Sequence, residues 1–90
     1  MVEKYPKRKE QLAYKELKEE NELLLVDEQK SEAHVLNAEA GGVWLLCNGK
    51  RSFEEMLRVL KESMASMGEP DLREHLKNTL KFLEEADLLE

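Results

Sequence analysis

Residues 32–57 have the sequence EAHVLNAEAGGVWLLCNGKRSFEEML, and the spacing of apolar residues changes inside this segment. Up to Asn37 the pattern is that of a short strand, with apolar and β-branched residues from Ala33 to Leu36. Asn37 is a good helix N-cap, and the apolar residues beyond it recur with a period of 3.6. Asn48-Gly49 predicts the end of this short helix. The residues on its apolar face are Ala40, Val43, Trp44 and Cys47.

Two short apolar segments precede the strand of residues 32–37. Leu23 to Val26 form a compact apolar run, and DEQKSE after it is a typical polar turn, so the two runs predict a hairpin. The segment from Leu12 to Lys18 fits either a strand or a helix start, because LAYKELKEENELL contains many helix formers. If this segment is extended, with EEN as its turn, the first third of the chain is a three-stranded antiparallel meander. We adopt this interpretation.

Two further helices are predicted after Asn48-Gly49. Ser52-Phe53-Glu54-Glu55 fits the S-x-x-E capping box, which satisfies two free backbone N–H groups at a helix start. The helix that it opens is expected to end near Gly68. Its apolar stripe consists of Phe53, Met56, Leu57, Leu60, Met64 and Met67.

The last helix is predicted to start at Pro70, a favoured first-turn residue, followed by Asp71. Its inward residues are Leu72, Leu76, Leu80 and Leu83. The fold class is therefore α+β. The expected arrangement is winged helix-turn-helix-like, a three-stranded antiparallel β-meander followed by three α-helices.

Composition limits the class of protein. The chain has 90 residues, of which 41% are hydrophobic and 38% charged, enough apolar content for one small core. We expect residues 1–10 to form a flexible basic arm and residues 11–90 to form a single domain. A net charge of −6 disfavours non-specific binding to DNA. No apolar run approaches the ~20 residues of a membrane span, and no signal peptide is evident, so a cytoplasmic protein is expected.

Residue types that support catalysis or metal binding are few. The single cysteine, Cys47, excludes an intramolecular disulfide, and its place on an apolar helix face is more typical of a buried thiol than of a nucleophile. His34 and His75 lack a third ligand type at metal spacing. We therefore expect no catalytic residue, no metal site and no cofactor, and we do not expect an enzyme.

Residues 35–60 and 72–90 resemble the PqqD family. The shared features are the strand end Val35-Leu36-Asn37, the small-residue helix from Ala38 to Leu46, the turn from Gly49 to Ser52, the helix start from Phe53 to Leu57, and the pairs Phe82-Leu83 and Leu88-Leu89. The chain departs from the family pattern at Asn48, where an acidic residue is frequent, and at Gly41-Gly42, where alanines are usual. Each glycine costs a helix ~1 kcal/mol relative to alanine.

The resemblance implies a non-catalytic peptide-recognition domain. Such domains capture the leader segment of a ribosomally synthesised precursor peptide (RiPP) and present it to a modifying enzyme, often a radical S-adenosylmethionine (SAM) protein. The expected partners are therefore a leader peptide and a peptide-modifying enzyme, with neither nucleic acid nor membrane.

Physical reasoning places the expected binding site between the last strand and the last helix. An open edge at residues 32–37 can pair with an extended peptide, and leader side chains would then contact the final helix. The expected peptide-binding residues are Glu32, Ala33, His34, Val35, Leu36, Asn37, Leu72, His75, Leu76, Thr79, Phe82 and Ala86. Leu76 and Phe82 also fit an ordinary core, and His34 also fits simple exposure to solvent.

Two other functions stay open at this point. A winged-helix nucleic-acid-binding protein is the main alternative, although Glu54, Glu55 and Glu62 accompany Arg58 and Lys61 on the helix after the turn. A subunit that only docks on an enzyme is the other alternative, and in that case the edge strand would already be covered.

Overall fold

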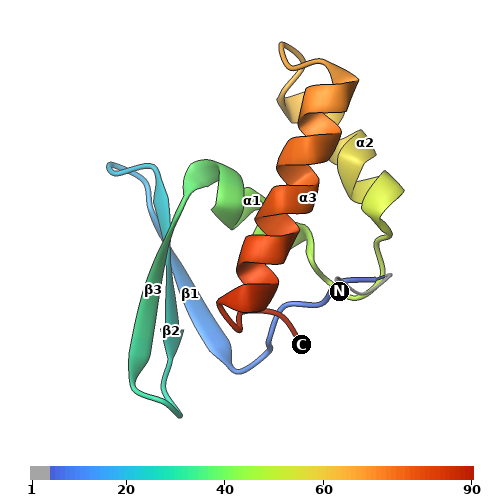
Figure 1. The fold of residues 1–90 in the computed structure, drawn as a ribbon. Helices are drawn as coiled ribbons and strands as arrows, with labels where there is room; N and C mark the ends of the chain where they lie inside the picture. Colours follow the sequence, from blue (N-terminus) through green and yellow to red (C-terminus); the bar gives the residue numbers. More distant parts are fainter. Residues whose placement is uncertain (1–4) are drawn as a thin grey trace.

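The structure, a computed structural model, describes residues 5–90. Three strands are followed by three helices in this range, as predicted (Figure 1). They are β1 (Leu12–Leu17), β2 (Glu22–Asp27), β3 (Glu32–Asn37), α1 (Ala38–Leu46), α2 (Phe53–Ser63) and α3 (Glu69–Glu85). Helix α1 packs against β2 and β3 and also against α3, while α2 packs against α3. Helix α1 therefore joins the sheet to the other two helices.

The sheet is an antiparallel meander in the order β1-β2-β3. Leu23 of β2 lies opposite Leu36 of β3, and both side chains are buried on the face that meets the helices. The two tight turns each end in a left-handed residue, Asn21 with φ 56° and Ser31 with φ 55°. Asparagine tolerates this conformation better than most residues do. This topology leaves β3 at one edge of the sheet.

The turn that leads into β3 is fixed by a buried carboxylate. The Oδ1 atom of Asp27 accepts hydrogen bonds from the backbone N–H groups of Gln29 at 3.0 Å and Lys30 at 3.2 Å. This local bonding stabilises a turn in the way typical of aspartate. Asp27 therefore helps to set where β3 begins.

Both predicted helix caps are present. The side chain of Asn37 accepts a hydrogen bond from the backbone N–H of Ala40 at 2.8 Å, so α1 starts directly at the end of β3. The Ser52 hydroxyl and the Glu55 carboxylate form the predicted reciprocal pair at the start of α2, each at 3.2 Å. Val43 and Trp44 of α1 and its C-cap Cys47 are buried, and Ala40 is partly buried, in agreement with the predicted apolar face.

The prediction that the second helix ends near Gly68 is wrong. Helix α2 ends at Ser63, because Met64 has φ −123° and ψ 52°, outside the helical region. Residues 64–68 form the connection that returns the chain to α3. Met64 and Met67 nevertheless pack against the core. They do so from the connection between α2 and α3, and not from the apolar face of a helix.

Trp44 links the sheet to both ends of the described chain. Its indole Nε1–H donates a hydrogen bond to the Leu88 carbonyl at 3.1 Å. The Tyr14 ring meets it edge-on, with the centroids 5.6 Å apart and the planes at 74°. The Arg8 guanidinium lies 5.6 Å from the centroid of the Trp44 ring. This buried side chain is the centre of the core.

The N-terminal segment makes more contacts than its basic composition indicates. Residues 1–4 of the predicted arm lie outside the described residues. Beyond them, Arg8 donates its backbone N–H to the Cys47 carbonyl at 2.8 Å, and the Lys7 carbonyl accepts from Glu90 at 2.7 Å. The Arg8 side chain also donates to the Leu45 carbonyl at 2.8 Å. These bonds place residues 7–9 between the end of α1 and the C-terminal residues.

The two glycines of α1 should respond oppositely to substitution. A Cβ atom at Gly41 would lie 2.9 Å from Cβ of Leu23, while one at Gly42 would meet nothing within 4 Å. We expect Gly42→Ala to raise the free energy of unfolding by roughly 0.5–1 kcal/mol, since alanine is the better helix former. Gly41→Ala should lower it by about 1 kcal/mol or more through overpacking. Urea denaturation of both variants tests this, and equal shifts of the same sign would contradict it.

Asp87 should make the fold acid-sensitive in a defined range. Ion pairs lower the pKa of Asp87 from 3.8 to about 2, and the pair with Lys30 has a larger effect than the pair with Lys9. Because the pKa is lower in the folded state, the stabilisation is complete above about pH 4 and is lost as the pH falls towards 2. The stability of the Asp87→Asn variant should lack this decrease between about pH 4 and 2. Asparagine also tolerates the φ of 62° at this position. Urea denaturation at several pH values tests this, and parallel curves for variant and wild type below pH 4 would contradict it.

Candidate functional site

A groove lies between the start of α1 and one face of α3. Its volume is about 310 Å³. The residues that line it are Asn37, Ala40, His75, Asn78, Thr79 and Phe82. The four α3 residues are spaced i, i+3, i+4 and i+7, which puts them on the same side of the helix. None of the lining residues is an acid or a lysine or arginine.

Burial differs sharply between the α3 residues of the groove. Thr79 is only 8% exposed and is the one buried polar residue among those described in α3. Phe82 is 53% exposed, although it is a large aromatic residue. An exposed aromatic ring beside a buried hydroxyl offers both apolar contact and hydrogen bonding to a ligand.

Strand β3 is an edge next to this groove. Within residues 5–90, no strand pairs with its outer side. In an antiparallel pair, alternate residues direct their N–H and C=O groups away from the partner, so β3 presents unpaired backbone groups at this edge. The side chains of Glu32, His34 and Leu36 lie on the sheet face that meets the helices, opposite Asp27, Leu25 and Leu23 of β2. Ala33 and Val35 lie on the other face, while the Asn37 side chain, at the end of the strand, caps α1.

The structure brings together four of the predicted site residues. Asn37, His75, Thr79 and Phe82 line the same groove. Leu36, Leu72 and Leu76 are instead buried in the core, and Ala86 packs against it. Leu76 is therefore a core residue, whereas Phe82 is exposed and is not part of the core.

Two lining residues were not predicted. Ala40 follows Asn37 by three residues and so faces the groove from the first turn of α1. Asn78 lies one helical turn from both His75 and Phe82. The helical spacing of His75 and Phe82 was sufficient to find Asn78. Ala40 was assigned to the core because of its apolar neighbours on α1.

Each histidine near the groove faces a glutamate. The Nε2 atom of His75 lies 3.3 Å from Oε2 of Glu39, and Nε2 of His34 lies 3.6 Å from Oε2 of Glu32. The His75 contact does not have the geometry of a hydrogen bond, and this buried Nε2 atom has no hydrogen-bond partner among residues 5–90. Unpaired buried polar atoms are uncommon, and a bound water, an ion or a functional role is the usual explanation.

The described residues offer little for catalysis. Burial raises the pKa of the Cys47 thiol to about 12, with a small opposing effect of Arg8, so the thiol stays protonated and is a poor nucleophile. Residues 5–90 contain no group of three or more histidine, cysteine, aspartate or glutamate residues placed to hold a metal ion. In the same range, no helix has the length and apolar character needed to cross a membrane.

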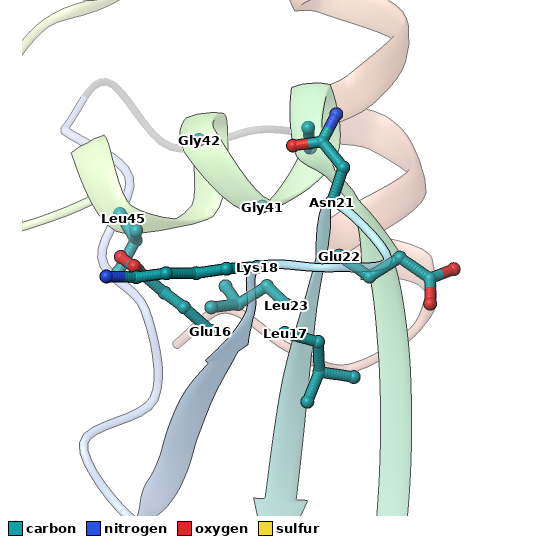
Figure 2. A pocket seen from close by; sticks show the side chains of 10 residues that line it. Glu16, Leu17, Lys18, Asn21, Glu22, Leu23, Gly41, Gly42 and Leu45 are labelled. Carbon is teal, nitrogen blue, oxygen red and sulfur yellow. The ribbon is translucent and has the colours of Figure 1, made fainter.

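Two other hollows flank α1. One of about 210 Å³ lies beside the turn between β1 and β2, where Figure 2 shows the Lys18 side chain extending toward Leu45. The other, of about 370 Å³, lies between α1 and α2 and includes Val59 and Met64. Neither contains a predicted site residue. The predicted residues therefore converge on the groove beside α3.

Two basic side chains where α2 meets α3 are paired with carboxylates. Arg73 forms a two-point contact with Glu54, at 2.6 and 3.0 Å, and this contact lowers the pKa of the Glu54 carboxyl. Lys61 pairs with Glu69 at 2.7 Å. These cations are already neutralised by the protein, which argues against phosphate binding on this face.

These features define a class of small domains, winged helix-turn-helix-like, with a free edge strand beside the last helix. The model of the family described as "Coenzyme PQQ synthesis protein D (PqqD)" matches residues 22–89, and the chain belongs to this family. The resemblance drawn from the sequence is thereby confirmed.

A solved structure shares the fold. It is described as "TbiB1 in Complex with the TbiA(beta) Leader Peptide". The two chains superpose with a TM-score of 0.75 at 21% sequence identity, over 93% of this chain and 94% of the other. A comparison with curated proteins finds no match.

Proposed function

We propose that this protein is a non-catalytic adaptor that binds the leader segment of a ribosomally synthesised precursor peptide and presents it to a modifying enzyme. The observation that carries the proposal is the open β3 edge beside a groove lined by α3, in a member of the PqqD family. A protein of the same fold has been solved with a leader peptide, which supports this assignment.

The proposed binding mechanism is β-strand addition. An extended leader segment pairs its backbone with the free N–H and C=O groups of Glu32–Asn37 and becomes a fourth strand. Because side chains alternate along a strand, every second leader side chain then points toward α3. Phe82 and Thr79 are placed to contact those side chains.

Backbone pairing and side-chain contacts have different roles in this mechanism. Hydrogen bonds to β3 are available to any extended peptide, so they contribute affinity without selecting a sequence. The contacts in the groove select the leader. The β3 residues Ala33 and Val35, whose side chains lie on the far face, contribute through their backbone groups, while His34 also faces the groove side.

The chemistry is assigned to the partner enzyme. In this proposal residues 11–90 form one binding domain that needs no cofactor, and the basic residues 1–10 precede it. A radical SAM protein is the proposed class of modifying enzyme, and the cytoplasm is the proposed location, since precursor peptides are made there.

Truncation of Phe82 should weaken leader binding with little effect on stability. Phe82→Ala removes an exposed aromatic contact at the groove, and we expect the dissociation constant to rise about 10-fold, as for a central interface residue. Val59→Ala is the matched control, because Val59 is 37% exposed on α2 and does not line the groove. Isothermal titration calorimetry with synthetic leader segments of precursor peptides encoded beside this gene measures both.

Two results would contradict the proposed function. One is that none of the neighbouring leader segments binds the wild-type protein. The other is that Phe82→Ala and Val59→Ala change the affinity equally, which would place the peptide elsewhere.

A further inference from the structure

We propose that the leader carries a lysine or arginine that pairs with Glu39 at the α1 end of the groove. This inference rests on the proposed function and names the chemistry of its ligand. Glu39 is in the first turn of α1, at the border between the groove, where it approaches His75, and the hollow between α1 and α2, which it lines; its side chain is 56% exposed. An exposed carboxylate next to an uncharged groove is well placed to bind a cation that enters with a ligand.

The surroundings of the groove are acidic. Glu32 is the first residue of β3, and Glu39 is the second residue of α1. On α3, Asp71 lies one turn before His75, and Glu85 lies one turn after Phe82, so both are on the groove side of the helix. These acids surround a site whose own lining is neutral.

Few basic residues near this region are free to neutralise these acids. Helical spacing puts Lys77 on the opposite side of α3 from His75 and Phe82. Lys81 lies one turn after the lining residue Asn78, at the flank of the groove, and is spaced i, i+4 from Glu85. Lys9 and Lys30 both pair with Asp87 after the end of α3. Acidic side chains therefore outnumber basic ones around the groove, which favours a basic peptide.

No lysine or arginine among residues 5–90 pairs with Glu39 in the structure, and its neighbour is His75. Its carboxylate lies 3.3 Å from His75 Nε2 but makes no hydrogen bond with it. A leader ammonium or guanidinium group would supply the charge-assisted hydrogen bond that is missing at this carboxylate. Movement of Glu39 toward that cation would also uncover the buried Nε2 atom of His75 for a hydrogen bond to the ligand.

This ion pair would also fix the register of the bound strand. Backbone pairing with β3 alone permits a peptide to shift by two residues without loss of hydrogen bonds. A basic side chain held by Glu39 at one end and an apolar side chain on Phe82 at the other allow only one register. The proposed leader therefore contains an apolar residue and a basic residue at a fixed spacing.

The test is a selection from phage-displayed random dodecapeptides against the full-length protein. We expect the wild-type protein to enrich lysine or arginine at one position relative to an apolar residue. The Glu39→Lys variant should instead enrich aspartate or glutamate there. Glu20→Lys is the control, because Glu20 is exposed in the turn between β1 and β2 and carries the same change of charge. It should select the same peptides as the wild type.

Affinities of the selected peptide complete the test. Replacing its basic residue by glutamine should weaken binding to the wild type by about 3- to 10-fold and to Glu39→Gln by less than about 2-fold. If selected peptides lose affinity for Phe82→Ala but show no basic preference, or if Glu39→Lys and Glu20→Lys behave alike, the charge inference is wrong while the proposed function stands. If no selected peptide depends on Phe82, the proposed function fails.

Discussion

The direct junction of β3 and α1 at Asn37 is the constraint on which the site depends. Asn37 is both the last residue of β3 and the N-cap of α1, so no loop separates the two elements. The junction fixes the direction of α1 relative to the sheet, and Gly41 lies directly against Leu23 as a result. Because α1 also packs against α3, the edge strand is held at a set distance from the helix that lines the groove.

Much of this arrangement could be predicted from the sequence because its determinants are local. The polar turns around β2, the cap at Asn37 and the capping box at Ser52 all lie within a few residues of the structure that they specify. Helical spacing likewise placed His75 and Phe82 on the same side of α3. Local hydrogen bonds and periodicity are visible in one sequence, and here they were sufficient for the fold.

Features that depend on distant residues were not predictable in the same way. The hydrogen bond between Trp44 and Leu88 joins residues that no local pattern connects, and the same holds for the bond between Arg8 and Cys47. The basic composition of the first residues therefore gave no indication of this docking. The burial of Leu76 and the exposure of Phe82 depend on how α3 is rotated about its axis relative to α1. The spacing of apolar residues shows which side of α3 faces inward, but it does not show where the buried stripe ends and the exposed surface begins.

In the proposed mechanism, affinity comes from the backbone edge of β3 and selectivity from a small number of side chains. Amide hydrogen exchange of β3, followed by NMR with and without a saturating leader segment, tests this most directly. Strand addition predicts slower exchange at alternate residues of Glu32–Asn37, those whose N–H groups point away from β2, with little change at the others. Unchanged exchange along β3 in the bound state, with protection confined to another surface, would contradict it.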